Sequence, residues 1–283
     1  MLKRTITAII MAIVIIPLVI LSRWPFMIGV ALLSYMAGYE LLNMMDKEAK
    51  SFKMLKFVAP LWNVLTIVTA YFYPSLVLPI MLLYLAVCLA LAIIHPSFSI
   101  KSSVLLIFTY IYSGLSFLVI MNLRDVHAEG YFNNGLYLLA YLALVVSFTD
   151  MGAYILGRLF GKKKLCPTIS PNKTIGGAIG GFIVGTIIGI AFYLIITRFI
   201  THSSFIPLNS MNAFLEIFLV VIFSMILSIA GQIGDLVASK LKRLYDVKDY
   251  GFIFPGHGGV MDRFDSLIFS SLVLYAIILL MVL

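Results

Sequence analysis

Long apolar stretches follow one another along almost the whole chain, and they constrain the fold more than any other feature. A helix needs about 20 mostly apolar residues to span the hydrocarbon core of a bilayer. By that measure the sequence predicts nine membrane-spanning helices. They cover residues 5–22, 26–45, 57–73, 75–95, 103–123, 136–157, 176–198, 213–237 and 263–283. The composition agrees, since only 11% of the 283 residues are charged, against about 25% in soluble domains.

Two of these predicted spans depend on local signals. The first follows the basic residues Lys3 and Arg4, as the apolar core of a signal peptide would. No small-residue cleavage site comes after it, so we expect a membrane span there. The third and fourth spans are separated only by Tyr73-Pro74-Ser75, which is a turn signal between two apolar runs. We therefore expect two helices on either side of this turn, the earlier one short.

Basic residues are distributed unevenly between the predicted loops. If the N-terminus is cytoplasmic, only Arg23, Arg124 and Arg198 of the 20 Lys and Arg residues fall on the outer side. Such a bias is the positive-inside rule. The sequence thus predicts an all-α polytopic membrane protein with a cytoplasmic N-terminus and an external C-terminus. The net charge of +8 follows from this topology and requires no nucleic acid, although basic loops also favour anionic lipids and phosphates.

Four aspartates lie at the ends of predicted spans six, eight and nine. Asp150 and Asp235 come late in spans six and eight, whereas Asp262 and Asp265 open span nine. Given the direction of each span, all four should reach the cytoplasmic face. Carboxylates inside membrane spans are costly and usually functional. Glu216 lies at the opposite end of span eight, and we interpret it as an interfacial bystander.

Span eight carries a polar stripe within an otherwise apolar helix. Gln232, Asp235, Ser239 and Lys242 are spaced so that they share one helical face. A helix that merely enters the headgroup region would account for Lys242 but not for Gln232 and Asp235. The stripe is therefore expected to face protein or a water-filled cavity.

The segment Pro255-Gly256-His257-Gly258-Gly259 predicts a tight turn whose amides can approach a phosphate. Asp262 and Asp265 follow it on one face of span nine. Carboxylates beside such a turn and several lysines suit a magnesium–nucleotide site, in which acids hold Mg²⁺ and cations hold phosphate oxygens. His257 fits either a structural hydrogen bond or contact with a phosphate or substrate.

The loop before span seven supports the same interpretation. Ser170 followed by Pro171 predicts the N-cap and first residue of that helix. Lys173 and Thr174 would then lie beside a helix N-terminus, where an anion binds favourably. The glycines of span seven favour close helix packing over catalysis, and the run Lys162–Lys164 is interpreted chiefly as a topology determinant. These glycines are Gly176, Gly177, Gly180, Gly181, Gly185 and Gly189.

The stretch from Ser239 to Asp265 contains a set of residues at fixed spacing. They are Ser239, Leu241, Lys242, Arg243, Lys248, Asp249, Gly251, Pro255, His257, Gly258, Gly259, Asp262, Arg263 and Asp265. This pattern resembles the signature of the phosphatidate cytidylyltransferases, also called CDP-diacylglycerol synthases. Gln232, Gly234 and Asp235 resemble its extension, and the segment from Asp150 to Lys162 resembles a second family motif. The resemblance covers about the C-terminal half of the chain.

One position departs from the family pattern. Ser170-Pro171-Asn172-Lys173-Thr174 resembles the family's Ser-Pro-x-Lys-Thr motif. The acidic residue that commonly precedes the motif's final glycine is replaced here by Gly176. We therefore assign no catalytic role to Gly176.

The resemblance implies that CTP and phosphatidate condense to CDP-diacylglycerol and pyrophosphate, with one or two Mg²⁺ ions required. We expect Asp235 and Asp262 to bind metal, with Asp150 and Asp265 as auxiliary ligands. Asp235, Asp262, Lys248 and His257 form the expected catalytic group. The expected substrate contacts are Ser170, Lys173, Thr174, Gln232, Ser239, Lys242, Arg243, Gly258, Gly259 and Arg263.

These expectations define one membrane domain, 1–283, in which 1–135 forms a scaffold and 136–283 carries the site. The site is expected at the cytoplasmic face of the inner membrane, among membrane lipids, and the sequence leaves a homodimer open. Alternatives are another CTP-dependent lipid enzyme, such as a polyprenol kinase or an archaeal-lipid cytidylyltransferase, and a secondary transporter. Transport is disfavoured because the acids gather at one face and no internal repeat is visible.

Overall fold

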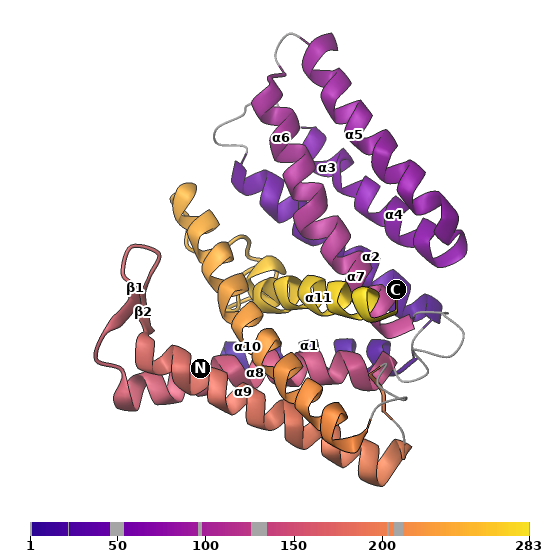
Figure 1. The fold of residues 1–283 in the computed structure, drawn as a ribbon. Coiled ribbons are helices and arrows are strands. Elements are labelled where there is room, and N and C mark those ends of the chain that lie inside the picture. Colours follow the sequence, from indigo (N-terminus) through magenta and orange to yellow (C-terminus); the bar gives the residue numbers. More distant parts are fainter. Residues whose placement is uncertain are drawn as a thin grey trace. The chain divides into compact units, whose positions relative to one another are not determined.

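The computed structural model describes residues 2–21, 23–45, 54–95, 98–125, 135–202, 204–206 and 212–282. Figure 1 shows the chain as a set of long helices with a single two-stranded hairpin among the described residues. The elements are α1 (Leu2–Leu21), α2 (Arg23–Met45), α3 (Leu55–Val58), α4 (Pro60–Phe72), η2 (Pro74–Leu76), α5 (Val77–Ile94), α6 (Ile100–Thr109), η3 (Tyr110–Leu115), α7 (Ser116–Asp125), α8 (Gly135–Phe160), β1 (Lys164–Cys166), β2 (Ser170–Thr174), α9 (Ile175–Ile195), η4 (Ile196–Thr201), α10 (Ala213–Leu244) and α11 (Met261–Val282).

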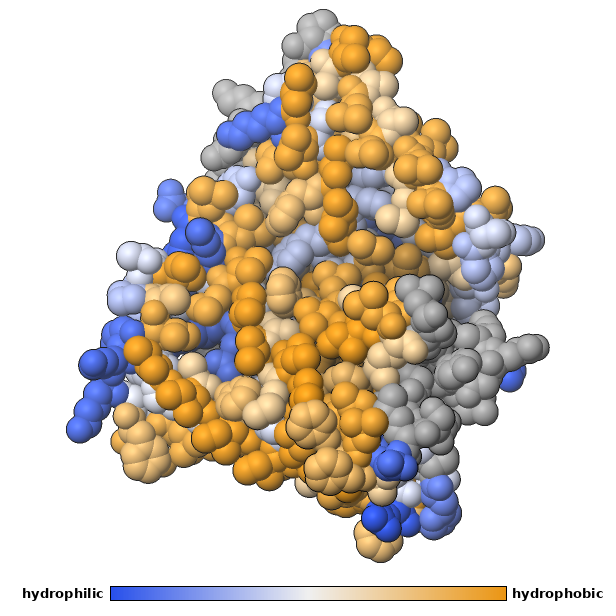
Figure 2. Space-filling model, in the orientation of Figure 1, coloured by the Kyte–Doolittle hydropathy of each residue, from blue (hydrophilic) through white to orange (hydrophobic). Residues whose placement is uncertain are grey.

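The predicted all-α membrane architecture is confirmed. Within the described ranges, 8 helical segments are long and apolar enough to cross a membrane. They are Arg23–Met45, Leu55–Phe72, Pro74–Ile94, Ile100–Arg124, Gly135–Phe160, Ile175–Thr201, Ala213–Leu244 and Met261–Met281. Each matches one predicted span from the second to the ninth, and the turn at Tyr73 separates α4 from α5 as predicted. The apolar helix α1 covers the first predicted span, and hydrophobic side chains dominate the face in Figure 2. The total of nine spans and the sides of the termini stay predictions.

The helices group into two compact units that alternate along the chain. Unit 1 comprises Met1–Asn122 and Leu244–Phe264, and unit 2 comprises Leu123–Arg243 and Asp265–Leu283. The glycine-rich segment thus belongs to the unit of the N-terminal helices. The functional division into 1–135 and 136–283 stays a prediction.

In unit 1 a buried amide fixes the position of α2. Asn63 on α4 donates to the Ser34 carbonyl (3.2 Å) and to the Ser113 hydroxyl (2.9 Å). A Cβ added to Gly38 would lie 2.9 Å from the Asn63 side chain, so this glycine lets the helices approach closely. Because a polar group buried without partners costs several kcal/mol in an apolar medium, these bonds favour one arrangement of α2 against α4 and η3.

In unit 2 the glycines of α9 pack directly against α8. A Cβ at Gly177 would lie 2.6 Å from the Ala153 carbonyl, and one at Gly181 would lie 2.5 Å from the Thr149 carbonyl. The predicted packing role of this glycine series is therefore confirmed. Hydroxyl bonds then join α8 to α10, including Thr149 to Ser228 (2.8 Å). These contacts place Asp150, the residue after Thr149, in a closely packed part of the unit.

The predicted N-cap of the seventh span is wrong by four residues, although the span itself begins within one residue of its predicted start. Ser170 does not cap a helix, because Ser170–Thr174 forms strand β2 and pairs antiparallel with β1. The cap is Thr174, whose hydroxyl accepts a hydrogen bond from the Gly177 amide (3.1 Å). Ser and Thr are both good N-caps. Pairing of the hairpin extends the backbone through Thr174, and the helix begins only after it.

Candidate active site

Three membrane helices of unit 2 bring the carboxylates of Asp150, Asp235 and Asp265 together, and we call these residues the acid cluster. Asp150 lies on α8, Asp235 on α10 and Asp265 on α11. Each carboxylate interacts electrostatically with the others. Gly234 permits this convergence, because a Cβ there would lie 2.9 Å from the Asp265 carbonyl. Of the four aspartates predicted to converge, these three lie together, and convergence of Asp262 with them stays a prediction.

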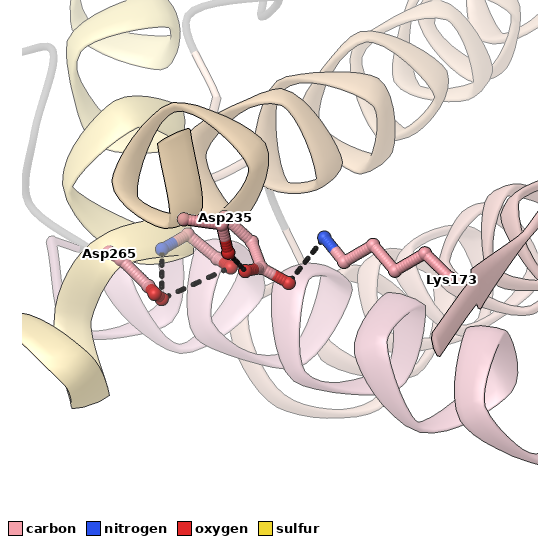
Figure 3. A network of polar contacts seen from close by, with 5 residues as sticks. Lys173, Asp235 and Asp265 are labelled. Atoms are coloured by element: carbon pink, nitrogen blue, oxygen red, sulfur yellow. Dashed lines mark hydrogen bonds and ion pairs between the residues drawn. The ribbon is translucent and has the colours of Figure 1, made fainter. Parts of the chain in front are cut away.

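A lysine from the hairpin offsets part of the negative charge. Lys173 Nζ lies 2.5 Å from Asp235 Oδ2, and Figure 3 shows the side chain reaching from β2 toward α10. The two side chains are 27% and 29% exposed, so the pair is partly shielded from solvent. Lys173 also interacts with Asp150, and Lys242 interacts with Asp265. Three carboxylates and two ammonium groups therefore lie within one polar region of apolar helices.

Hydroxyl and amide donors orient the acid cluster further. Ser239 Oγ donates to Asp235 Oδ1 (3.2 Å), one helical turn away on α10. The Ser266 amide donates to Asp265 Oδ1 (2.7 Å), and the Ser266 hydroxyl donates to the same oxygen (3.5 Å). Gln232, the first residue of the predicted stripe, donates to the Ala178 carbonyl of α9 (3.1 Å). The polar stripe of α10 thus faces protein, as predicted.

The donor set of the acid cluster suits a hard cation. In the described part of the chain, no group of three or more His, Cys, Asp or Glu side chains is arranged as a ready-made metal cage. Mg²⁺ usually keeps several waters and binds through one or two carboxylates together with substrate phosphates. The all-oxygen acid cluster, with Lys173 and Lys242 beside it, fits that requirement. That Asp150, Asp235 and Asp265 hold such an ion stays a prediction.

Asp262 has a different environment in unit 1, where it organises the glycine-rich turn, residues 254–260. Its Oδ2 accepts the amides of Tyr250 (2.8 Å) and Gly259 (2.9 Å). The predicted tight turn is confirmed, since Phe254 N donates to the Gly258 carbonyl (2.9 Å) and Gly258 has a φ of +86°. Glycine adopts such a positive φ without the steric penalty of other residues. The sharing of one metal by Asp262 and Asp235 stays a prediction.

Glu40 on α2 is a buried acid that the sequence argument missed. It is only 2% exposed and lies inside a membrane-spanning helix. Its carboxylate accepts the amides of Val260 (3.0 Å) and Met261 (3.1 Å) at the start of α11. The rule applied to the four aspartates, that an acid within a membrane span is functional by default, would have identified it.

These bonds correct one expectation about the turn. The backbone amides of the glycine-rich turn were expected to approach a phosphate. Instead, those of Gly259, Val260 and Met261 donate to the carboxylates of Asp262 and Glu40. A helix N-terminus attracts negative charge of either origin, and here two acidic side chains supply it. The assignment of Gly258 and Gly259 to substrate stays a prediction.

The other predicted site residues differ in exposure. Lys248, Arg243 and Arg263 are exposed, and Arg263 Nε donates to the His257 carbonyl (2.7 Å). His257 is half-buried, and its Nδ1 is buried with no hydrogen-bond partner among the described residues. Ser170 lies at the start of β2, and Thr174 is used as the helix cap. Lys162–Lys164 are exposed beside the hairpin. Glu216, expected to be a bystander, accepts a hydrogen bond from Tyr193.

Fold and site together define a polytopic membrane protein with an acidic, lysine-containing site built on its helices. A family model described as "Cytidylyltransferase family" matches residues 2–281. The chain therefore belongs to the cytidylyltransferase family, in agreement with the resemblance seen in its sequence.

Three relatives are similar to the chain over nearly its whole length. The phosphatidate cytidylyltransferase of Staphylococcus haemolyticus is 35% identical over 268 residues, covering 94% of each chain. The protein of the same name from Bacillus subtilis is 34% identical over 277 residues, covering 96% of each chain. That of Staphylococcus aureus strain COL is 34% identical over 280 residues, covering 94% of each chain. The similarity extends beyond the C-terminal half on which the resemblance was first based.

Proposed function

We propose that the chain transfers the cytidylyl group of CTP to phosphatidate, giving CDP-diacylglycerol and pyrophosphate. The observation that carries this proposal is the acid cluster with Lys173 paired to Asp235. Family membership and the names of the relatives support the same reaction. A site that combines carboxylates with ammonium groups matches a reaction between two polyanions, since the acids can hold a cation and the lysines can hold phosphate oxygens.

The proposed reaction requires positioning more than proton transfer. An oxygen of the phosphatidate phosphate attacks the α-phosphorus of CTP, and the bond to the bridging oxygen breaks as pyrophosphate leaves. The nucleophile is already an anion, so the main barrier is repulsion between the two substrates. Mg²⁺, when bound, would neutralise charge on the phosphate oxygens. Lys173 and Lys242 would hold phosphates in line, and Asp235 would contribute to holding the cation.

We further propose that the site faces the cytoplasm. The distribution of Lys and Arg supports this orientation, because it places Lys173, Lys242 and Lys248 on the predicted cytoplasmic side. CTP is a water-soluble polyanion, whereas phosphatidate keeps its tails in the bilayer. A site at the ends of membrane helices allows both substrates to reach the acid cluster.

The test uses purified protein in detergent with phosphatidate, Mg²⁺ and CTP labelled on either the α- or the γ-phosphate. Label from the α-position is expected in CDP-diacylglycerol, with one pyrophosphate released for each lipid formed. Label from the γ-position is expected only in pyrophosphate. Transfer of the γ-label to a lipid would identify a CTP-dependent lipid kinase instead, and absence of any labelled CDP-lipid would refute the proposed reaction.

A further inference from the structure

Glu40 and Asp262 hold four backbone amides around the glycine-rich turn. Asp262 accepts Tyr250 N and Gly259 N, while Glu40 accepts Val260 N and Met261 N at 3.0–3.1 Å. The amides held by Glu40 are among the first of α11, which have no partner within the helix. A carboxylate at this position is also stabilised by the helix dipole. The turn between the two carboxylates is therefore fixed from both sides.

Two glycines, Gly251 and Gly259, lie so close to the Glu40 carboxylate that neither position has room for a side chain. A Cβ at Gly251 would collide with Glu40 Oε1, and one at Gly259 would collide with both carboxylate oxygens. Gly259 does not have a positive φ, so the need for glycine there is steric rather than conformational. Glu40 thus explains the absence of a side chain at two positions of the signature segment, although it lies more than 200 residues earlier in the chain.

We infer that Glu40 is a positioning residue for the reaction, and this inference rests on the proposed function. Glu40 sets the glycine-rich turn and the start of α11, and through them the places of His257 and Asp262. A buried acid inside a membrane span is costly. A serine or threonine hydroxyl, as found at the N-caps of other helices, would be enough to cap the N-terminus of α11. The carboxylate adds a second acceptor oxygen, so that it holds two consecutive amides.

The inference is tested with Glu40→Gln and Glu40→Asp in the full-length protein. Gln keeps the shape but places an amide group against one backbone N–H, and Asp is one methylene too short to reach both amides. We expect kcat to fall at least about tenfold per folded molecule, with KM for CTP within about twofold of wild type. Hydrogen exchange at residues 259–261 should become faster. Glu216→Gln is the matched control. Glu216 lies in the first turn of α10, at the opposite end of that helix from Asp235, so its substitution should leave kcat unchanged.

A double-mutant cycle separates positioning from general destabilisation. Gly259→Ala should be more damaging in the wild-type background than together with Glu40→Asp, because the shorter acid leaves room for the methyl group. Wild-type kcat in folded Glu40→Gln, or full additivity in the cycle, would overturn the inference. If the wild-type enzyme forms no CDP-diacylglycerol, the proposed function fails. The hydrogen-exchange result still tests the contact between Glu40 and the turn.

An independent feature of unit 1 is an apolar groove between α1 and α2. Its volume is about 620 Å³, and its walls include Ile10, Val14, Leu18, Leu33 and Met36. Ile253, Phe254 and Pro255 also line the groove, and Thr7 Oγ1 donates to the Pro255 carbonyl (3.0 Å). The groove therefore runs along two apolar helices and reaches the glycine-rich turn.

We propose that this groove binds one acyl chain of phosphatidate, which again depends on the proposed function. Thr7 is the one polar side chain in a lining of apolar residues and a glycine, so the groove matches a hydrocarbon chain. Its volume lies within the usual range of about 300–1,000 Å³ for small-molecule sites. The glycine-rich turn, whose Phe254 and Pro255 line the groove, carries His257, which the sequence places in the catalytic group. A chain in the groove would thus bring its own phosphate toward that turn.

Leu33→Trp and Met36→Trp test the groove, because each indole would fill part of it. KM for dioleoyl phosphatidate should rise at least about fivefold, roughly the cost of 1 kcal/mol of lost binding. KM for dihexanoyl phosphatidate, whose chains are too short to need the groove, should stay within about twofold. Leu82→Trp, at a 56% exposed position of α5, is the control. Equal effects on both lipids, or no effect on either, would refute acyl-chain binding here.

Discussion

Lys173 and Asp235 form an ion pair of 2.5 Å that joins the hairpin strand β2 to the long helix α10. The pair connects the two parts of the chain that the sequence assigned separately to phosphate and to metal. It is partly buried and surrounded by two further carboxylates. Removal of the lysine would therefore leave three neighbouring acids with less compensating charge.

Lys173→Ala is expected to lower kcat/KM for CTP by about 100-fold or more, which is typical for loss of one preorganised charge-stabilising group. Lys173→Arg should retain more activity because it keeps the charge, although the planar guanidinium does not reproduce the ammonium geometry. Lys164→Ala is the control, since Lys164 is an exposed residue of the adjacent strand β1. Steady-state assays of all three variants check the prediction. Equal losses of kcat/KM in Lys164→Ala and Lys173→Ala would indicate a non-specific effect of the positive charge on the hairpin.

Asp265→Asn should raise the Mg²⁺ concentration needed for half-maximal activity by about 10–100-fold. Asn keeps the size of the side chain but removes the charge that a hard cation requires. Asp246→Asn is the matched control, because Asp246 is exposed and has a φ of 52°, a conformation that Asn also tolerates. The measurement is a Mg²⁺ titration of activity at saturating CTP. An unchanged titration curve for Asp265→Asn would remove this residue from the metal site.

Much of the fold could be predicted because helix length and apolarity are local properties of the sequence. The boundary at Tyr73-Pro74 was correctly located because its signal is local. Tyr73 leaves the helical conformation there, and Pro74 begins the next helical segment. The convergence of Asp150, Asp235 and Asp265 followed from counting helix directions. Neither prediction required knowledge of which helices touch.

The errors arose where long-range pairing decides local structure. Ser170 and Pro171 have the local chemistry of a helix start, yet strand pairing with Lys164–Cys166 keeps them extended. The sequence predicted that amides of the turn can approach a phosphate, but it did not reveal that those of Val260 and Met261 are bonded to Glu40, which lies on α2. No spacing within the signature segment reveals an acceptor that far away in the chain.

Gly185→Ala should destabilise the packing of α8, α9 and α10. A Cβ there would collide with the Thr149 hydroxyl and approach the Val145 carbonyl to 3.0 Å. Overpacking of this kind costs about 1–3 kcal/mol. Gly231→Ala on α10 is the control, because its Cβ would make only ordinary contacts of 3.4–3.6 Å. Thermal unfolding in detergent should give a lower midpoint for Gly185→Ala than for Gly231→Ala, and equal midpoints would contradict the packing argument.

The two native cysteines provide a test of membrane orientation without any substitution. Cys166 lies on β1 and is partly exposed, whereas Cys88 is buried at 1% exposure in a membrane helix. If the hairpin is cytoplasmic, a membrane-impermeant maleimide should label Cys166 in inside-out vesicles and not in sealed right-side-out vesicles. Cys88 should stay unlabelled in both until the protein is denatured, which makes it an internal control. Labelling of Cys166 in sealed right-side-out vesicles would invert the proposed topology and place Lys173, seven residues further along the chain, away from cytoplasmic CTP.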